Sequence, residues 1–417
     1  MKQLTSDKKR LLSNLFSLSA LRGANMILPL VTLPYLVRVL GVENFGLVNF
    51  SLSIIMYFNI LISFGFELSA TREISIHRDD SKKISEIFSS VMIIKGILFL
   101  ISFLILSILI VFIDKLNEHM LLYFSTFGIV FGNLLFPIWL FQGMERMKYI
   151  TYINVISRVI FTVFIFILVK NKQDYIYVPI LNSLGAILGG IYALWLVFKL
   201  FSIQLIFPKR KMVLLQVNKS YHFFISRVAS TGSRYYATTI IGLFFGNTIV
   251  GYYSMVEKLY YAFMSLGGIV SQTFYPYMSR TKNIVFYKKV LYITIGASIA
   301  ILLPLLYFNE IFLQFVFDVE NEMLSKIFVI VFSGAVFGIA SALIGYPILA
   351  AFGEIKYANN SLIYASIIYV IYITLSALIF KNIFLVALSL VVSATIGLLF
   401  RMYYINKVKI FKKALND

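Results

Sequence analysis

The sequence predicts an all-α integral membrane protein with twelve transmembrane helices, and three observations lead to that fold class. The 417 residues are 60% hydrophobic and 13% charged, and the mean hydropathy is +0.89. A soluble domain has about 45–50% apolar and about 25% charged residues. Apolar runs of membrane-spanning length recur along the whole chain, and basic residues concentrate in every second segment between them.

Composition also excludes several classes of protein and site. The 40 Phe and 27 Tyr residues argue against disorder, because disordered chains are poor in aromatic residues. The absence of Cys rules out disulfides, thiolate metal sites and Cys nucleophiles. The three His residues are scattered, so we expect no metal site and no cofactor. The net charge of +19 would suit a nucleic-acid binder, but the hydropathy argues against a soluble one.

A helix that crosses a hydrocarbon core of about 30 Å needs about 20 mostly apolar residues. Twelve such runs are present, at 14–40, 47–68, 88–113, 120–142, 151–169, 176–198, 223–245, 252–276, 290–308, 327–350, 359–379 and 383–400. The first run is too long for the apolar core of a cleaved signal peptide. The polar stretch from Thr71 to Glu86 predicts a surface helix between the second and third spans.

Lys and Arg counts predict the orientation, because short basic loops stay in the cytoplasm. With both termini placed inside, the cytoplasmic segments hold 25 of the 37 Lys and Arg residues and the outer loops hold 5. We therefore expect a multi-pass membrane protein with cytoplasmic N- and C-termini. Most of the net positive charge is then a consequence of topology.

The longest cytoplasmic segment divides the spans into six and six. We expect an N-terminal six-helix bundle at 1–200, a cytoplasmic linker at 201–222 and a C-terminal six-helix bundle at 223–417. The segment GVENFGLVN at 41–49 aligns with GNTIVGYYS at 246–254 at an offset of 205, which also places Arg22 on Arg227. QGMERMKY at 142–149 resembles FGEIKY at 352–357. These matches predict two bundles related by a parallel pseudo-two-fold repeat, as in other parallel-repeat carriers.

The remaining seven cations lie inside predicted spans, where Glu67 and Glu257 are the only anions. Seven cations facing lipid would cost on the order of 20 kcal/mol, so some must line a wet cavity or form pairs. Lys95 and Arg38 lie near span ends, and we expect them to extend to the headgroups. The others are predicted to contact an anionic substrate: Arg22, Arg227, Arg234, Lys258 and Arg158.

Helical spacing supports this interpretation. Arg227, Thr231, Arg234 and Thr238 recur at intervals of four, three and four residues, which predicts one helical face. Polar stripes on apolar helices point towards a bundle interior. Glu67 and Glu257 are candidates for ion coupling or for pairing with a cation. Seven of the eight prolines lie in predicted spans and predict kinks.

The longest polar segment is about two dozen residues, so no soluble catalytic domain is expected. The sequence has no phosphate-binding loop, HExxH, GxSxG or dinucleotide fingerprint. We therefore expect neither an enzyme nor an ATP-driven pump.

Several segments resemble the O-antigen and polysaccharide lipid flippases (Wzx type) of the multidrug/oligosaccharidyl-lipid/polysaccharide exporter superfamily. The first is PLVTLPYLVRVLGVENFG at 29–46. The others are GFELSATRE at 65–73, FQGMER at 141–146, VGYYSMVEK at 250–258 and the Gly353-Glu354 loop. The resemblance covers essentially the whole chain, and the order and spacing of the segments make it specific.

The resemblance implies two six-helix bundles around a central cavity, and a substrate of undecaprenyl-pyrophosphate carrying a short oligosaccharide. Such a substrate would pass from the cytoplasmic to the outer leaflet, driven by an ion gradient. An interior rich in cations suits a pyrophosphate by charge. The implied partners are this lipid-linked oligosaccharide, membrane lipids, a polysaccharide polymerase and a chain-length regulator, without nucleic acid.

Two alternatives remain open at the level of sequence. The first is a cation or drug antiporter of the same superfamily, whose site should contain membrane carboxylates; this interior carries an excess of cations. The second is a non-transporting subunit of a glycan assembly complex. Buried arginines on repeat-equivalent helices argue against it, because they cost stability.

Overall fold

The computed structural model describes the backbone of residues 2–410 and the side chains of residues 28–410. Every regular element in that part of the chain is a helix, and no strand occurs within it. The prediction of an all-α protein is therefore confirmed.

The chain divides into two compact units, Met1–Tyr235 (unit 1) and Tyr236–Asp417 (unit 2). The predicted linker, 201–222, contains most of helix α9 (Arg210–Arg227), and this helix packs on α2 and α3 of unit 1. The remaining helices of unit 1 are α1 (Lys2–Ser63), α2 (Phe66–Ile76), α3 (Ser81–Phe112), α4 (Asp114–Asn117), α5 (Met120–Leu135), α6 (Ile138–Gly143), α7 (Met147–Leu168), η1 (Lys172–Ile176), α8 (Tyr177–Phe201) and η2 (Val228–Gly232).

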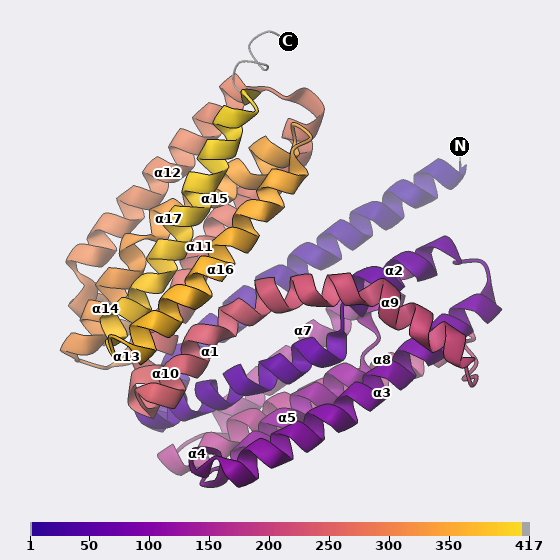
Figure 1. Cartoon of the computed structure of the whole chain (residues 1–417), viewed down its shortest axis with the longest axis horizontal. Helices are drawn as coiled ribbons and strands as arrows, with labels where there is room; N and C mark the ends of the chain where they lie inside the picture. The colour runs from indigo at the N-terminus through magenta and orange to yellow at the C-terminus, as the bar shows by residue number, and fades with distance from the viewer. Residues whose placement is uncertain (1, 411–417) are drawn as a thin grey trace. The chain divides into compact units, whose positions relative to one another are not determined.

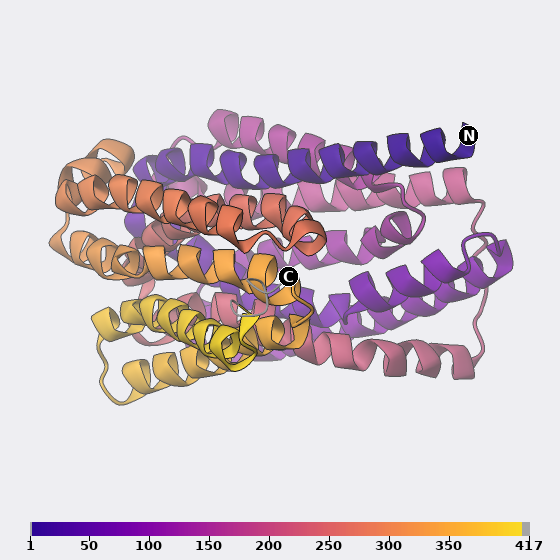
Figure 2. The ribbon, with the colours of Figure 1, turned by 90° about the horizontal axis from the view of Figure 1, so that it is seen from above.

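Helix α10 (Ser233–Phe244) crosses the boundary between the units, and the other helices of unit 2 follow it. They are α11 (Asn247–Thr281), α12 (Ile284–Tyr307), α13 (Asn309–Phe317), α14 (Glu322–Ser333), α15 (Ala335–Ile344), η3 (Gly345–Ala350), α16 (Ile355–Leu378) and α17 (Ile383–Lys407). In Figure 1, α12, α15, α16 and α17 run side by side, and Figure 2 shows the same bundle in orange and yellow from above.

Nine helical stretches among the described residues are long and apolar enough to cross a membrane, which makes the chain a multi-pass membrane protein. They are Leu28–Ile76, Ser81–Phe112, Met120–Gly143, Met147–Leu168, Lys172–Phe201, Ile284–Tyr307, Glu322–Ala350, Ile355–Leu378 and Ile383–Lys407. The first predicted span lies in the long α1, and the second begins in α1 and ends in the first turn of α2. Those predicted at 223–245 and 252–276 correspond to charged helices that this set does not include. The number twelve stays a prediction.

Two aligned glycines adopt nearly the same unusual backbone conformation. Gly41 interrupts α1 with φ 76° and ψ 164°, and Gly246 precedes α11 with φ 93° and ψ 168°. This region is accessible to glycine because it lacks a Cβ. The two residues are those that the sequence alignment pairs at an offset of 205.

The second pair of aligned segments is 142–149 and 352–357. The structure aligns them in a register that does not place Gly143 on Gly353. The left-handed residue is Glu145 (φ 54°) in one segment and Gly353 (φ 91°) in the other. The next residue closes the turn in both segments. The Arg146 N–H donates to the Phe141 carbonyl at 2.8 Å, and the Glu354 N–H donates to the Leu349 carbonyl at 2.8 Å. This closing pattern is that of a Schellman motif. Aligning the two segments on this shared turn places Lys148 on Lys356 and Tyr149 on Tyr357. Gly143 is then not the equivalent of Gly353.

The prediction of one surface helix from Thr71 to Glu86 is wrong, because the stretch contains a turn. Helix α2 ends at Ile76, and α3 begins at Ser81. Asp80 caps α3 by accepting a hydrogen bond from the Lys83 N–H at 3.0 Å. An Asp at this position satisfies a free donor at the helix start, so the polar residues belong to two helix ends and the turn between them.

Helices α5 and α8 approach closely at Gly132. A Cβ at this position would lie 2.4 Å from the Ala186 carbonyl carbon of α8, so the packing requires glycine. The close approach fixes the C-terminal half of α5, which carries Asn133.

Candidate functional site

The break between α1 and α2 positions Glu67 in unit 1. Phe64 and Gly65 both have positive φ, at 40° and 76°, and they separate the two helices. Glu67 therefore lies in the first turn of α2. A carboxylate is favourable there because the N-terminal end of a helix carries partial positive charge.

Glu67 forms an ion pair with Arg227, the last residue of α9. An Arg227 Nη2 hydrogen donates to Glu67 Oε2. The side chains remain 38% and 30% exposed, respectively, so the pair is accessible from one side. Sequence reasoning named both residues, and it did not foresee that they pair, because 160 residues separate them.

A second ion pair joins the same two helices. Lys219 of α9 and Glu73 of α2 lie 2.7 Å apart, N to O. The Ser69 and Ser220 hydroxyls form a buried hydrogen bond of 2.7 Å between the two helices. The orientation of α9 on α2 therefore does not depend on Glu67 alone.

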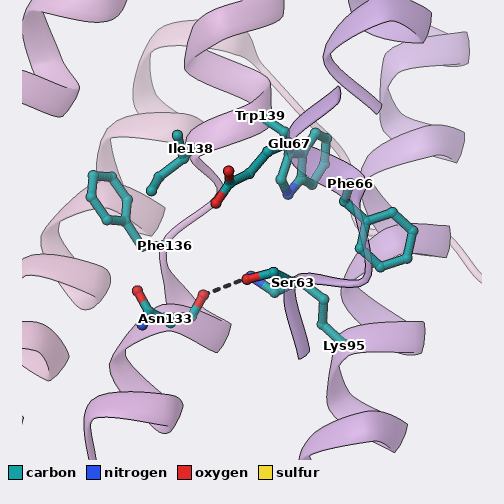
Figure 3. Close-up of a pocket in the computed structure, with 8 residues that line it drawn as sticks. All are labelled: Ser63, Phe66, Glu67, Lys95, Asn133, Phe136, Ile138 and Trp139. Carbon is teal, nitrogen blue, oxygen red and sulfur yellow. Dashed lines mark hydrogen bonds between the residues drawn. The ribbon is translucent and has the colours of Figure 1, made fainter. Parts of the chain in front are cut away.

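Glu67 also lines a small cavity inside unit 1, shown in Figure 3. Its volume is about 20 Å³, enough for about one water molecule. The cavity is lined by Ser63, Phe66, Glu67, Lys95, Asn133, Phe136, Ile138 and Trp139. Trp139 is only 2% exposed, and its buried indole N–H has no hydrogen-bond partner within the side chains described, those of residues 28–410.

Lys95 lies on the other side of this cavity, and it is only 5% exposed. Its Nζ donates to the main-chain oxygens of Asn133 at 2.6 Å and Leu134 at 3.2 Å. The Asn133 oxygen lacks its helical donor, because the residue four positions later is Pro137. The expectation that Lys95 extends to the headgroups is therefore wrong: the ammonium satisfies carbonyls at the broken end of α5.

Amide and hydroxyl groups extend the polar interior of unit 1. The Asn133 amide donates to Asn59 Oδ1 at 2.6 Å, which links α5 to α1. The Thr71 hydroxyl lies 3.2 Å from Gln142 Oε1 and 3.2 Å from the Trp139 oxygen. These contacts hold the walls of the cavity in place.

The other predicted substrate contacts do not gather around this cavity. Arg158 in α7 and Arg234 in α10 are exposed. Arg22 lies outside the residues whose side chains are described. The stripe from Arg227 to Thr238 contains the π-helix η2, so the 3.6-residue spacing used to predict one face does not hold across it. Arg38 is exposed, as a residue at a span end can be.

Unit 2 contains the second predicted carboxylate. The Thr238 hydroxyl of α10 donates to Glu257 Oε2 of α11 at 3.3 Å. The buried phenols of Tyr253 and Tyr369 lie within electrostatic range of this carboxylate. Lys258, the next residue, is half-buried.

Arg401 is a buried cation that sequence reasoning missed, because it was assigned to the C-terminal cytoplasmic segment. It lies inside α17 and is 4% exposed. It donates to the Ser361 hydroxyl at 3.1 Å, to the Ser341 hydroxyl at 3.0 Å and to the Ser341 carbonyl. The apolar residues that continue after it, Met402 to Ile405, were the available signal.

The chemistry of these sites is that of anion binding and charge pairing. Within residues 28–410, no group of three or more His, Asp or Glu side chains is arranged to hold a metal ion. Arg227 presents a partly exposed guanidinium, which suits bidentate binding of a phosphate.

Comparisons with known proteins agree with the sequence resemblance. Residues 11–282 match the family described as polysaccharide biosynthesis protein. A protein of Escherichia coli (strain K12) that is named as an O-antigen transporter is 32% identical over 298 residues, 69% of this chain and 71% of that protein. One of Shigella dysenteriae with the same name is 26% identical over 328 residues, 76% of this chain and 81% of that protein.

Solved structures share the fold. The lipid II flippase MurJ, in an inward closed conformation, matches with a TM-score of 0.72 at 15% identity, over 97% of this chain and 89% of that one. An inward-facing multidrug resistance MATE transporter matches with a TM-score of 0.58 at 14% identity, over 95% and 98%. At these identities the likeness concerns the fold alone. With the family match over more than half of its length and a relative at 32% identity, the chain belongs to the polysaccharide biosynthesis protein family.

Proposed function

We propose that the protein is a flippase for a lipid-linked oligosaccharide. Its substrate would be undecaprenyl-pyrophosphate carrying the repeat unit of an O-antigen or a similar polysaccharide. The protein would move it from the cytoplasmic to the outer leaflet of the inner membrane by alternating access, coupled to an ion gradient. The observation that carries this proposal is Arg227, a partly exposed cation at the end of α9 that already holds the Glu67 carboxylate, in a chain of the polysaccharide biosynthesis protein family.

The architecture proposed for this function has twelve spans in two six-helix bundles, a parallel pseudo-two-fold repeat and cytoplasmic termini. The matching conformations of Gly41 and Gly246 support the repeat. So do the matching chain reversals at Glu145 and Gly353. Equivalent bundles that rock against each other would expose a site to each side in turn.

The proposed contacts to the pyrophosphate or to acidic sugars are Arg22, Arg227, Arg234, Lys258 and Arg158. Arg227 has the strongest support, because its guanidinium already holds a carboxylate. Glu257 is the proposed ion-coupling residue, because its carboxylate lies between helices α10 and α11 and accepts a hydrogen bond from the Thr238 hydroxyl. A polysaccharide polymerase and a chain-length regulator are the proposed protein partners.

Charge removal tests the function directly. Arg227→Ala and Arg22→Ala would be expressed in a strain that needs this carrier for its surface glycan. We expect a loss of glycan of at least about tenfold at normal membrane abundance, because a charge-assisted hydrogen bond contributes about 1.5–3 kcal/mol. Arg280→Ala is the matched control, since Arg280 is exposed in the last turn of α11. Normal glycan from both Arg227→Ala and Arg22→Ala would contradict the proposal.

Arg227→Lys separates charge from geometry. Lysine keeps the charge but lacks the planar fork that binds phosphate oxygens in pairs. A milder defect than that of Arg227→Ala would show that charge alone matters. An equal defect would assign the role to the fork.

A further inference from the structure

The Glu67 carboxylate lies between two cations that are held in different ways. Arg227 contacts it directly and remains 38% exposed. Lys95 is fixed by two main-chain oxygens, and no ion pair joins it to Glu67 within the described part of the chain. Lys95 and Glu67 nevertheless line the same cavity. One of the two cations is accessible, and the other is immobile.

The cavity supplies room and a second donor for a movement of the carboxylate. Glu67, Lys95 and Trp139 line the same cavity, and Figure 3 shows the Glu67 side chain beside Trp139 with its carboxylate oxygens among the lining side chains. Among the described residues the buried Trp139 N–H meets no hydrogen-bond partner, and a buried donor without a partner is unfavourable. A carboxylate turned away from Arg227 would therefore meet an ammonium and an indole N–H.

We propose that Glu67 is exchanged between Arg227 and Lys95 when an anionic ligand binds. In the unliganded protein the carboxylate holds Arg227. A pyrophosphate group that takes Arg227 displaces the carboxylate, which turns towards Lys95 and Trp139. This inference rests on the proposed function, since it assumes that Arg227 receives the pyrophosphate. Glu67 is then a positioning residue that acts through Arg227.

Charge explains why the exchange needs both cations. An anion on Arg227 would repel a carboxylate beside it, and a carboxylate without a partner is costly inside an apolar bundle. Lys95 removes that cost because its charge is already in place. A buried cation with only carbonyl partners gains from the arrival of the carboxylate.

The exchange also gives Arg227 selectivity. Glu67 competes with every ligand for the same guanidinium, so a weak or singly charged anion displaces it poorly. A pyrophosphate carries more charge and more acceptor oxygens, and it competes better. The carboxylate thereby selects against ligands that do not carry the pyrophosphate, which is a form of specificity by repulsion.

The protein contains its own reporter. It has two tryptophans, and Trp139 lines the cavity while Trp195 is exposed and stacked on Tyr192. The Trp195→Phe chain therefore has one tryptophan, beside Glu67. A carboxylate that moves next to its indole N–H changes its emission.

The experiment titrates the detergent-solubilised, full-length Trp195→Phe chain with farnesyl pyrophosphate, with farnesyl monophosphate and farnesol as comparison ligands. Binding is measured independently by equilibrium dialysis of labelled ligand. We expect the Trp139 emission to change and saturate over the concentration range in which farnesyl pyrophosphate binds. Farnesol should produce no change.

Glu67→Gln in the same background removes the competing carboxylate. We expect binding of farnesyl pyrophosphate on the order of tenfold tighter, the loss of a competing interaction of about 1.4 kcal/mol. We also expect weaker discrimination against the monophosphate and no change of emission. Glu73→Gln is the matched control, because it removes the other ion pair between α2 and α9. It should leave affinity and emission response as they are.

The outcomes separate the two proposals. Binding without a change of Trp139 emission overturns the exchange and leaves the flippase proposal standing. Weaker binding by Glu67→Gln also overturns the exchange. No binding of farnesyl pyrophosphate by either the native or the Trp195→Phe chain overturns both. The Trp195→Phe chain keeps every cavity residue, so its emission tests the exchange even where Glu67→Gln folds poorly.

Discussion

Pro137 in unit 1 and Pro347 in unit 2 each interrupt a helix, and different side chains satisfy the carbonyls that they leave free. In unit 1 a single ammonium, that of Lys95, binds the Asn133 and Leu134 oxygens. In unit 2 the Tyr287 hydroxyl donates to the Leu343 oxygen at 2.8 Å. The Ser271 hydroxyl donates to the Ala342 oxygen at 3.0 Å.

The backbone problem is the same in both places. Asn133 and Leu343 each precede a proline by four residues, so each lacks the N–H that an α-helix would offer. A buried carbonyl without a donor is unfavourable. Helix α5 therefore stops at Leu135, and α15 passes into the π-helix η3. Only the chemistry of the donor differs.

The difference has a functional meaning. Hydroxyl donors satisfy the Leu343 and Ala342 carbonyls without adding charge. Arg401 does add charge in unit 2, but it is bound by Ser341 and Ser361. Lys95 adds charge at the wall of a cavity that also contains Glu67. The contact that satisfies the free carbonyls of α5 therefore also places the positive charge that the proposed exchange of Glu67 requires.

Removing the charged donor should give the largest effect. Lys95→Met leaves two buried carbonyls without a donor, and each costs about 1–3 kcal/mol. We expect a loss of about 2–4 kcal/mol, measured as a lowered midpoint of thermal unfolding in detergent. Lys82→Met is the control, because Lys82 lies exposed in the first turn of the same helix.

A double variant sharpens this prediction. Pro137→Ala restores an N–H that can bind the Asn133 oxygen within the helix. Combined with Lys95→Met, it should recover part of the lost stability, so that the two changes are not additive. Strict additivity would show that Lys95 stabilises unit 1 for a reason other than the broken helix end.

The sequence predicted those features that depend on composition and on local spacing. The apolar runs predicted the helical class. Arg227 was marked as a candidate site residue by its depth in such a run, and Glu67 by being one of two anions inside the predicted spans. Their pairing was not predictable, because it depends on how α9 packs on α2. Local spacing also misled where the helix type changes, since η2 shifts the face between Arg227 and Arg234.

Lys95 and Arg401 are two buried cations whose burial was not predictable from the sequence. Both lie near the end of an apolar run, where a cation ordinarily extends to the headgroups. Their burial depends on acceptors that other helices supply: carbonyls of α5 for Lys95, and serines of α15 and α16 for Arg401. The sequence of one helix does not indicate which acceptors the neighbouring helices supply.

The neutral donor in unit 2 should have a smaller effect than Lys95. Tyr287→Phe removes one hydroxyl and keeps the ring in place, leaving the Leu343 carbonyl unsatisfied. We expect a loss of about 1–2 kcal/mol in the same unfolding measurement. Tyr292→Phe is the control, since Tyr292 lies on the same helix and is 69% exposed. A loss as large as that of Lys95→Met would break the distinction between the two repairs.

The smallest effect is expected for Ser271→Ala. The Ser271 hydroxyl binds the Ala342 carbonyl, but serine is small and its removal leaves little empty volume. We expect a loss of about 0.5–1.5 kcal/mol, the net contribution of one neutral hydrogen bond. Ser279→Ala on the same helix is the control, because that hydroxyl is bound to its own helix at Tyr275. Equal effects of the two serine variants would mean that the Ala342 carbonyl finds another donor. The repair in unit 2 would then rest on Tyr287 alone, as the repair in unit 1 rests on Lys95.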